Sequence, residues 1–245
     1  MFDNLDPSQV LVNYGYNYSE HALLSSFLPK TEEIEGIKFT HVDANYANIT
    51  LSAVGDPENN GGHCDLVYST DGENWSSYTV GTTITLYTDD YVIFKAAYSY
   101  NSGIKSVDDY NYYQFVVEGQ PKVEGDISYL YSDDPANDYL NNYQFTHLFD
   151  MCEFNTQSGY ESEITMPSCG KWMANSASYA FKEMFNSATL SRIKIPVDPD
   201  GWDSGGDFDG NFTDWVYEIN QGYDQSPTLW IPQGWTWSYG YSAVP

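Results

Sequence analysis

Basic side chains are scarce in this chain of 245 residues. Nine Lys and Arg residues face 35 Asp and Glu residues, which gives a formal net charge of -26 at pH 7, and Arg192 is the only arginine. Nucleic acids and anionic membrane surfaces are both met by Lys and Arg side chains. The composition therefore predicts no nucleic-acid partner, and it favours a basic surface in a larger assembly instead.

Long apolar runs and a cysteine framework are also missing. No segment approaches the ~18 apolar residues of a membrane-spanning helix, so no membrane insertion is predicted. The N-terminus, Met1–Asp6, has neither the basic segment nor the apolar region of a secretory signal. The three cysteines are irregularly spaced, unlike a disulfide framework or a zinc site. We expect Cys152 to be a buried packing residue, because it aligns with Ala188 and Trp215 in the repeats described below.

Motifs for catalysis are absent as well. The four His residues lie in separate segments, and the sequence contains no His-Glu-x-x-His, Cys-x-x-Cys or Gly-x-Ser-x-Gly pattern. Acidic residues are so abundant that counting leaves open a carboxylate pair for glycoside hydrolysis. Nothing distinguishes one such pair from solvated acidic loops. We therefore predict a protein that is not an enzyme and that has no cofactor other than a candidate calcium ion.

Aromatic residues are abundant: 23 Tyr, 12 Phe and 7 Trp. At this density they argue against disorder and suit β-sheets and contact surfaces. Short alternating segments recur between turn signals, and Asp71-Gly72 is a hairpin signal. We predict an immunoglobulin-like β-sandwich over residues 36–119, with strands at 36–42, 47–54, 64–69, 75–78, 82–86, 91–96 and 112–117.

The last 126 residues, 120–245, repeat one pattern three times. A Phe-x-x-x-Phe pair is followed by an alternating apolar segment that ends at Pro, as in Phe145–Phe149 with Ile164–Pro167. The later copies are Phe181–Phe185 with Ile193–Pro196 and Phe208–Phe212 with Leu229–Pro232. Spacing of four predicts a helical face, and alternation predicts a strand. The pattern predicts a short α/β repeat array, which builds a surface.

Residues 1–35 are too short to own a core, so we predict an arm. It has a short extended patch and an amphipathic helix that ends at Pro29. The arm packs either on the next domain or on another protein. Its anchoring residues are predicted to be Val10, Leu11, Leu23, Leu24 and Phe27.

Several segments resemble a known module. These are residues 66–78, 84–86, 92–96, 113–119, 125–130 and 145–152. Together they resemble the β-module and the repeats of BspA-like leucine-rich-repeat proteins. Such modules occur in bacterial surface proteins and in proteins of tailed bacteriophages. The repeats lack the usual Cys-Thr-Ser-Leu run, and the third copy is degenerate, with Gly210 between its two Phe residues.

The acidic loop between the second and third repeats is the candidate cation site. Carboxylates on a Gly-containing loop are the ligands that Ca²⁺ prefers. The spacing does not fit an EF-hand, so an acidic loop without an ion is the alternative. The candidate ligands are Asp198, Asp200, Asp203, Asp207 and Asp209.

The C-terminal segment is rich in Trp and Tyr residues. Such rings can anchor a protein contact, cap the repeat stack or stack on sugar rings. The candidate binding residues are Trp230, Trp235, Trp237, Tyr239 and Tyr241.

The resemblance and the missing secretion signal together predict a structural component of a tailed-phage virion, assembled in the host cytoplasm. Placement as a capsid decoration or head fibre is preferred, with a tail accessory protein as the second choice. We expect other virion proteins as partners, several copies per assembly, and contact with a host glycan as an option. The alternative is a carbohydrate-binding adhesin on a bacterial surface. The predicted fold is mainly β with some α, in the order arm, sandwich, repeat domain.

Overall fold

The fold is given by a computed structural model that describes residues 34–43, 45–99, 102–135, 140–166, 179–194 and, for the backbone alone, 228–230. The described part of the chain is mainly β. Its strands are β1 Ile37–Thr40, β2 Ala47–Val54, β3 His63–Cys64, β4 Leu66–Ser69, β5 Ser76–Ser77, β6 Thr83–Leu86, β7 Tyr91–Ala96, β8 Ile104–Lys105, β9 Tyr112–Glu118, β10 Lys122–Asp126, β11 Glu163–Thr165, β12 Arg192–Lys194 and β13 Thr228–Trp230.

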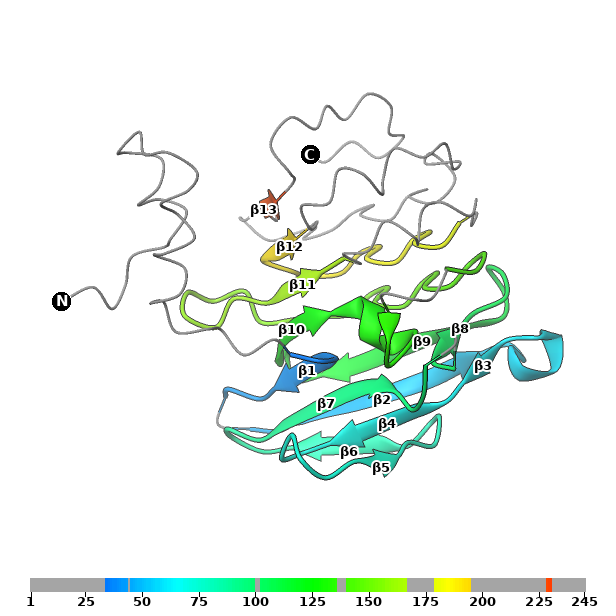
Figure 1. The fold of residues 1–245 in the computed structure, drawn as a ribbon. Coiled ribbons are helices and arrows are strands. Elements are labelled where there is room, and N and C mark those ends of the chain that lie inside the picture. Colours follow the sequence, from blue (N-terminus) through cyan, green and yellow to red (C-terminus); the bar gives the residue numbers. More distant parts are fainter. Residues whose placement is uncertain are drawn as a thin grey trace, which may run out of the picture. The chain divides into compact units, whose positions relative to one another are not determined.

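The strands predicted between residues 36 and 117 are present, although the predicted strand 64–69 is divided between β3 and β4. β3 pairs with β8 in a separate two-stranded sheet, and the other strands form two larger sheets. One sheet has the order β6-β2-β9, and the other begins β5-β4-β7-β1-β10 (Figure 1). Alternate side chains point inward, as in residues 47–52 of β2, where every second residue is buried. The two inner faces meet in a core of rings, where Phe115 of β9 lies 5.1 Å from Phe39 and 5.5 Å from Phe94. The two sheets therefore pack face to face.

The side chain of Tyr78 holds the loop between β5 and β6 in place. The Tyr78 hydroxyl accepts a hydrogen bond from the Leu51 backbone N–H at 2.9 Å and donates one to the Thr82 carbonyl. Its ring packs edge-on against Phe94 at 5.2 Å. Burial raises the pKa of this phenol, although its hydrogen bond from Leu51 acts the other way. The side chain thus joins the loop to both sheets.

Strand β10 connects the two packed sheets, which are called the sandwich below, to a parallel array. It pairs antiparallel with β1 and parallel with β11, and β11, β12 and β13 follow in parallel. The register places Ile164 beside Ile193, and Ile193 beside Leu229. The strand part of the predicted repeat is therefore confirmed in all three copies. Figure 1 shows these strands following one another beyond β1.

The junction depends on glycine. At Gly125 in β10, φ is +125°, and a Cβ atom would lie 2.1 Å from the carbonyl oxygen of Gly36. Any side chain at this position would therefore collide with the backbone of the segment that leads into β1.

The prediction of helices at the Phe pairs is wrong for the first two copies. Residues 142–151 and 180–187 form consecutive turns instead. In the first copy the N–H groups of Thr146, Leu148, Asp150 and Cys152 each donate to the carbonyl three residues earlier. Every fourth residue has positive φ. These residues are Tyr143, His147 and Met151 in the first copy and Tyr179, Glu183 and Ser187 in the second. The third copy, Phe208–Phe212, lies outside the described residues. Within them, the only helices are the 3-10 turns Glu58–Asn60 and Ile127–Leu130.

The turn segments stack like strands. We call 142–152 the first coil and 179–188 the second coil. The N–H groups of the first coil that do not close its turns donate to carbonyls of the second coil. These bonds run from Phe145 to Ala180, His147 to Lys182, Phe149 to Met184 and Met151 to Asn186, at 2.7–3.0 Å. On its other side the first coil continues the three-stranded sheet, because the Phe115 N–H donates to the Leu148 carbonyl at 2.9 Å. Neighbouring coils therefore replace the hydrogen bonds that a helix would make internally.

One apolar core runs through both regions. The buried cluster contains Phe39 and Phe115 of the sandwich together with Phe149, Ile164 and Phe185 of the stack. The eight-stranded sheet likewise crosses residue 120 without a break. Of the predicted arm, residues 1–33 lie outside the described part of the chain, as does the segment after Lys194 apart from the backbone of β13.

Candidate functional site

The coil stack carries columns of aromatic rings that explain the Phe-x-x-x-Phe pattern. Phe149 lies between Phe115 and Phe185, at centroid distances of 5.5 and 5.6 Å and interplanar angles of 9° and 7°. Phe145 stacks on Phe181 at 6.1 Å. Each ring thus lies over the equivalent ring of the next coil. The columns fix the spacing of the coils and hold their outer side chains in register.

A polar row lies on the outer side of the same coils. The Nδ1 atom of His147 is 3.0 Å from Asp150 Oδ2 and 3.6 Å from Glu183 Oε2. The imidazole stacks on Tyr112 of β9 at 4.4 Å. The other carboxylate oxygen of Asp150 accepts a hydrogen bond from the Asn186 side chain at 2.9 Å. The row therefore connects β9, the first coil and the second coil.

The electrostatics of this row act on Tyr112. Burial raises the pKa of its phenol, and the negative charges of Asp150 and Glu183 raise it further. The phenol accordingly stays neutral throughout the physiological range and packs as a ring against His147.

Lys182 forms the second polar connection. Its Nζ atom lies 2.5 Å from Asp109 Oδ2 in the loop before β9, and 3.7 Å from Glu183. Burial by itself lowers the pKa of Lys182, but the hydrogen bond and charge of Asp109 outweigh it, so the pKa is raised. The second oxygen of Asp109 is buried and has no hydrogen-bond partner among the described residues. Lys182 therefore compensates the charge of this partly buried carboxylate.

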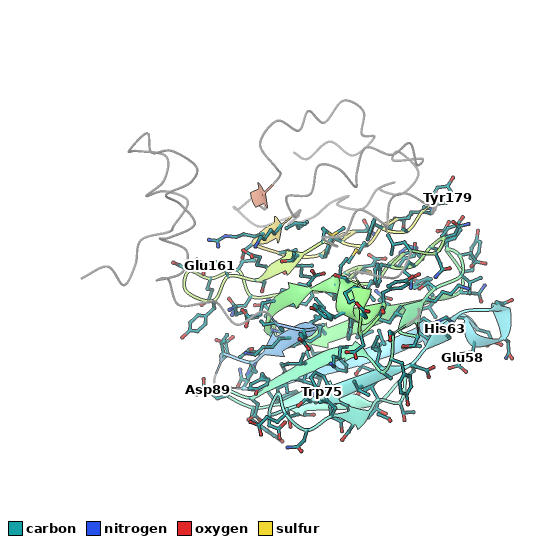
Figure 2. All side chains as sticks on the ribbon, in the orientation of Figure 1. Glu58, His63, Trp75, Asp89, Glu161 and Tyr179 are labelled. Carbon is teal, nitrogen blue, oxygen red and sulfur yellow. The ribbon has the colours of Figure 1, made fainter. Side chains whose placement is uncertain are left out.

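A pair of tyrosines ends the row. Tyr143 and Tyr179 stack at 5.1 Å, and Tyr179 also faces the Lys182 ammonium at 5.8 Å. Tyr179 is 37% exposed and is labelled in Figure 2, where it lies at the tip of the second coil. The row thus presents an aromatic edge to solvent.

Cys152 plays the packing role that the repeat alignment predicts. It is buried, as is its equivalent Ala188. Its thiol donates to the Phe115 carbonyl, with a sulfur–oxygen distance of 3.0 Å. Burial raises the pKa of the Cys152 thiol, and the charge of Asp150 adds to the effect. A neutral, inaccessible thiol is a poor nucleophile.

The residues of this row were not among those singled out from the sequence. The signal that finds them is the 36-residue offset of the first two copies, which aligns Tyr143 with Tyr179 and His147 with Glu183. The described residues contain no group of three or more His, Cys, Asp or Glu side chains placed to hold a metal ion. What the row does is bind neighbouring coils together and order their surface.

The sites predicted from the sequence lie elsewhere. The anchoring residues of the arm, the five aspartates of the candidate calcium loop, and Trp235, Trp237, Tyr239 and Tyr241 all fall outside the described residues. Trp230 belongs to β13, where its Cα pairs with that of Lys194. Those assignments stay predictions.

Comparison of the chain with protein-family models, with curated proteins and with solved structures gave no match. In the part of the chain that the structure describes, no helix has the length and apolar character to span a membrane.

Proposed function

We propose that the chain is a non-enzymatic structural component of a tailed-phage virion, placed on the head as a decoration or fibre or, as a second choice, on the tail. In this proposal residues 1–35 anchor the chain to another virion protein. The immunoglobulin-like sandwich and the leucine-rich-repeat-like stack then present a surface, in several copies per particle.

The observation that supports the proposal is the continuous joining of the two regions. Strand β10 pairs with β1 on one side and with β11 on the other, while Phe115 of the sandwich begins the ring column of the coils. A sandwich and a stack that share a sheet and a core form one continuous unit, which suits display. The charge of -26 suits attachment to a basic surface of an assembly.

The test is the location of the chain in a lysate of the bacterial cells that produce it. Particles are banded on a density gradient, and peptides of the chain are quantified across the fractions by mass spectrometry. We expect the chain to band with DNA-containing particles at a constant ratio to the capsid protein. A chain lacking residues 1–33 should stay folded, as judged by circular dichroism, and should leave the particle fraction.

Recovery of the full-length chain in the cell envelope rather than in particles would contradict the proposal and support the bacterial adhesin. An envelope protein that binds polysaccharide only while Trp235 and Trp237 are intact would support that alternative further. The gradient and the binding assay are independent, so each can fail alone.

A further inference from the structure

The outer face of the three-stranded sheet differs from the rest of this acidic chain. Its side chains carry almost no charge. Among the side chains that point outward from β2, β6, β9 and the residues beside these strands, Glu118 is the only ionisable group other than the tyrosine phenols. Outward side chains are identified by alternation with the buried positions of each strand. They are Tyr46, Asn48, Thr50, Ser52, Val54, Thr83, Thr85, Tyr87, Tyr112, Gln114, Val116 and Glu118.

Two exposed tyrosines stand side by side at one end of this face. Ala47 of β2 pairs with Leu86 of β6, and both are buried. Tyr46 immediately precedes Ala47, and Tyr87 immediately follows Leu86. Because successive side chains alternate, both tyrosines project on the opposite, solvent side of the sheet. They are 53% and 63% exposed. Neither phenol makes a hydrogen bond or a ring contact with another residue in the described part of the chain. Asp89, labelled in Figure 2, marks the turn that follows Tyr87.

A row of hydrogen-bonded polar side chains lies next to the tyrosines on the same face of the sheet. The Asn48 side chain donates to Glu118 at 2.9 Å and accepts from the Thr85 hydroxyl at 2.8 Å. The hydroxyl groups of Thr50 and Thr83 are 2.8 Å apart in the next row. These groups are exposed but already oriented by one another. They offer hydroxyl and amide partners in fixed positions, which limits the ordering cost of binding a ligand.

The far end of the face is already occupied. Tyr112 stacks on His147, and the Gln114 side chain donates to the Asp150 carbonyl at 2.6 Å. The first coil thus engages the face near the start of β9, and the open part is the end that contains Tyr46, Tyr87, Asn48 and Thr85.

We propose that this open end binds a neutral glycan. Sugar rings have an apolar face of C–H bonds that packs against an aromatic ring, and a rim of hydroxyl groups that suits amide and hydroxyl partners. Tyr46 and Tyr87 supply the aromatic platform, while Asn48, Thr85 and Glu118 supply the polar partners.

The charges around the face select the class of ligand. Asp43 and Asp89 lie within three residues of Tyr46 and Tyr87 in the chain, and Glu118 is hydrogen-bonded to Asn48. The outward positions of the sheet include no Lys or Arg. An anionic polysaccharide would therefore be repelled. A protein partner would need an apolar centre in the interface. On this face Val116, at 46%, is the only aliphatic side chain that is more than one third exposed. Neutral hydroxyl-rich chains fit best.

The inference rests on the proposed display role and names the ligand class of the displayed surface. It is tested on the purified full-length chain by affinity electrophoresis in native gels that contain laminarin, mannan, xylan or galactomannan, with alginate as the anionic comparison. We expect retardation in at least one neutral polysaccharide and none in alginate. In the retarding gel, the Tyr46→Ala/Tyr87→Ala double variant should bind at least tenfold more weakly.

The matched control removes two exposed tyrosines from another part of the sandwich. Tyr98 and Tyr110 are 70% and 81% exposed, so Tyr98→Ala/Tyr110→Ala should leave retardation unchanged. Equal thermal melting of the two double variants verifies folding, because all four side chains are surface residues. Absence of retardation in all four neutral gels, retardation in alginate, or retention of binding by the Tyr46/Tyr87 variant would each overturn the inference. Loss of binding in Trp235→Ala/Trp237→Ala alone would overturn it in favour of the C-terminal aromatics. None of these results depends on whether the chain bands with particles.

Discussion

Asp71 shows how one exposed carboxylate can organise a hairpin. It accepts hydrogen bonds from the backbone N–H groups of Glu73 and Asn74 at 2.9 and 2.7 Å, and from the side chains of Ser69 and Asn74 at 2.9 and 2.7 Å. The side-chain hydrogen bond of Asn74, followed by the backbone bonds, holds the pKa of Asp71 well below its usual range. The ionised carboxylate is therefore the form that closes the turn between β4 and β5.

A stability change with pH follows from that lowered pKa. The stabilisation by Asp71 is present above the ordinary Asp pKa of about 4, and it is lost as pH falls below that value toward the folded-state pKa. We expect Asp71→Ala to lower the melting temperature at pH 7 and to reduce the difference between the melting temperatures at pH 7 and pH 3. Glu73→Ala, beside it and exposed, is the control. Parallel melting curves for the Asp71 variant and the wild type across this range would contradict the prediction.

Met151, by contrast, destabilises the fold locally, because its backbone conformation is unfavourable for a residue with a side chain. Its φ is +59° and its side chain is 72% exposed. An L-residue in the left-handed region costs about 1 kcal/mol, and glycine avoids that cost. We expect Met151→Gly to raise the free energy of unfolding by up to about 1 kcal/mol in urea titrations. Met151→Ala keeps the strain and should change little; a gain of the same size for alanine would show that the side chain, not the backbone, is responsible.

At the scale of elements, the ring columns connect the two coils to each other and to β9. Phe149 is fully buried between Phe115 and Phe185, and Phe154 meets it edge-on at 5.8 Å. Truncating such a ring costs about 3–5 kcal/mol. Phe149→Ala should lower the free energy of unfolding by that amount, measured by urea denaturation, whereas Tyr160→Ala, at a 48% exposed position, should remain within about 0.5 kcal/mol of wild type. A loss below about 1 kcal/mol for Phe149→Ala would mean that the columns do not hold the coils.

The ion pair between the second coil and the loop before β9 adds a second kind of connection. Removing the cation in Lys182→Met leaves the partly buried Asp109 carboxylate without its partner, which should cost about 1–3 kcal/mol at pH 7. Because the pKa of Lys182 is raised, its stabilisation persists at neutral pH and disappears only as pH rises above the ordinary Lys range of about 10.4.

Two further variants separate the charge from the side chain's packing. Lys105→Met removes a cation for which no ion pair is found among the described residues, and it should be near neutral. Asp109→Asn should recover part of the loss when it is combined with Lys182→Met, because the orphaned charge is gone. Urea titration at pH 7 of the wild type, Lys182→Met, Asp109→Asn and the double variant gives the coupling free energy between the two side chains. Strict additivity of the two single changes would contradict the ion pair's role.

The strands were predictable from sequence because alternation directly reports which side chains are buried. The coils were not, since Phe residues four apart fit a helical face and also fit turns that repeat every four residues. The left-handed positions would have been revealed by Gly or Asn, but Tyr143, His147 and Glu183 occupy them, and the lateral hydrogen bonds that hold them there come from the next coil. Strand β10 has only one apolar residue, Val123, and alternation alone cannot find it. The outer face of β2, β6 and β9, with Glu118 as its one ionisable acid, could be recognised only once the neighbouring strands were known.

At the scale of the whole molecule, the sandwich and the coil stack depend on each other. The Val123 N–H of β10 donates to the Ser162 hydroxyl at 3.1 Å, and the Asn155 N–H donates to the Pro121 carbonyl at 3.0 Å. The first coil covers the edge of β9 that would otherwise present free backbone groups. A boundary at residue 120 therefore separates two sequence patterns that share one sheet and one core.

This shared core predicts one cooperative unfolding transition for the described part of the chain. Phe39→Ala in β1 and Phe185→Ala in the second coil each remove a fully buried ring, one from the sandwich and one from the coil stack. If the regions unfold together, each variant should shift the same calorimetric transition downward, by several degrees, without splitting it. Tyr98→Ala, at an exposed position, should leave that transition in place. Two resolved transitions, of which Phe39→Ala moves one and Phe185→Ala moves the other, would mean that the sandwich and the coil stack are separate folding units despite the sheet that joins them.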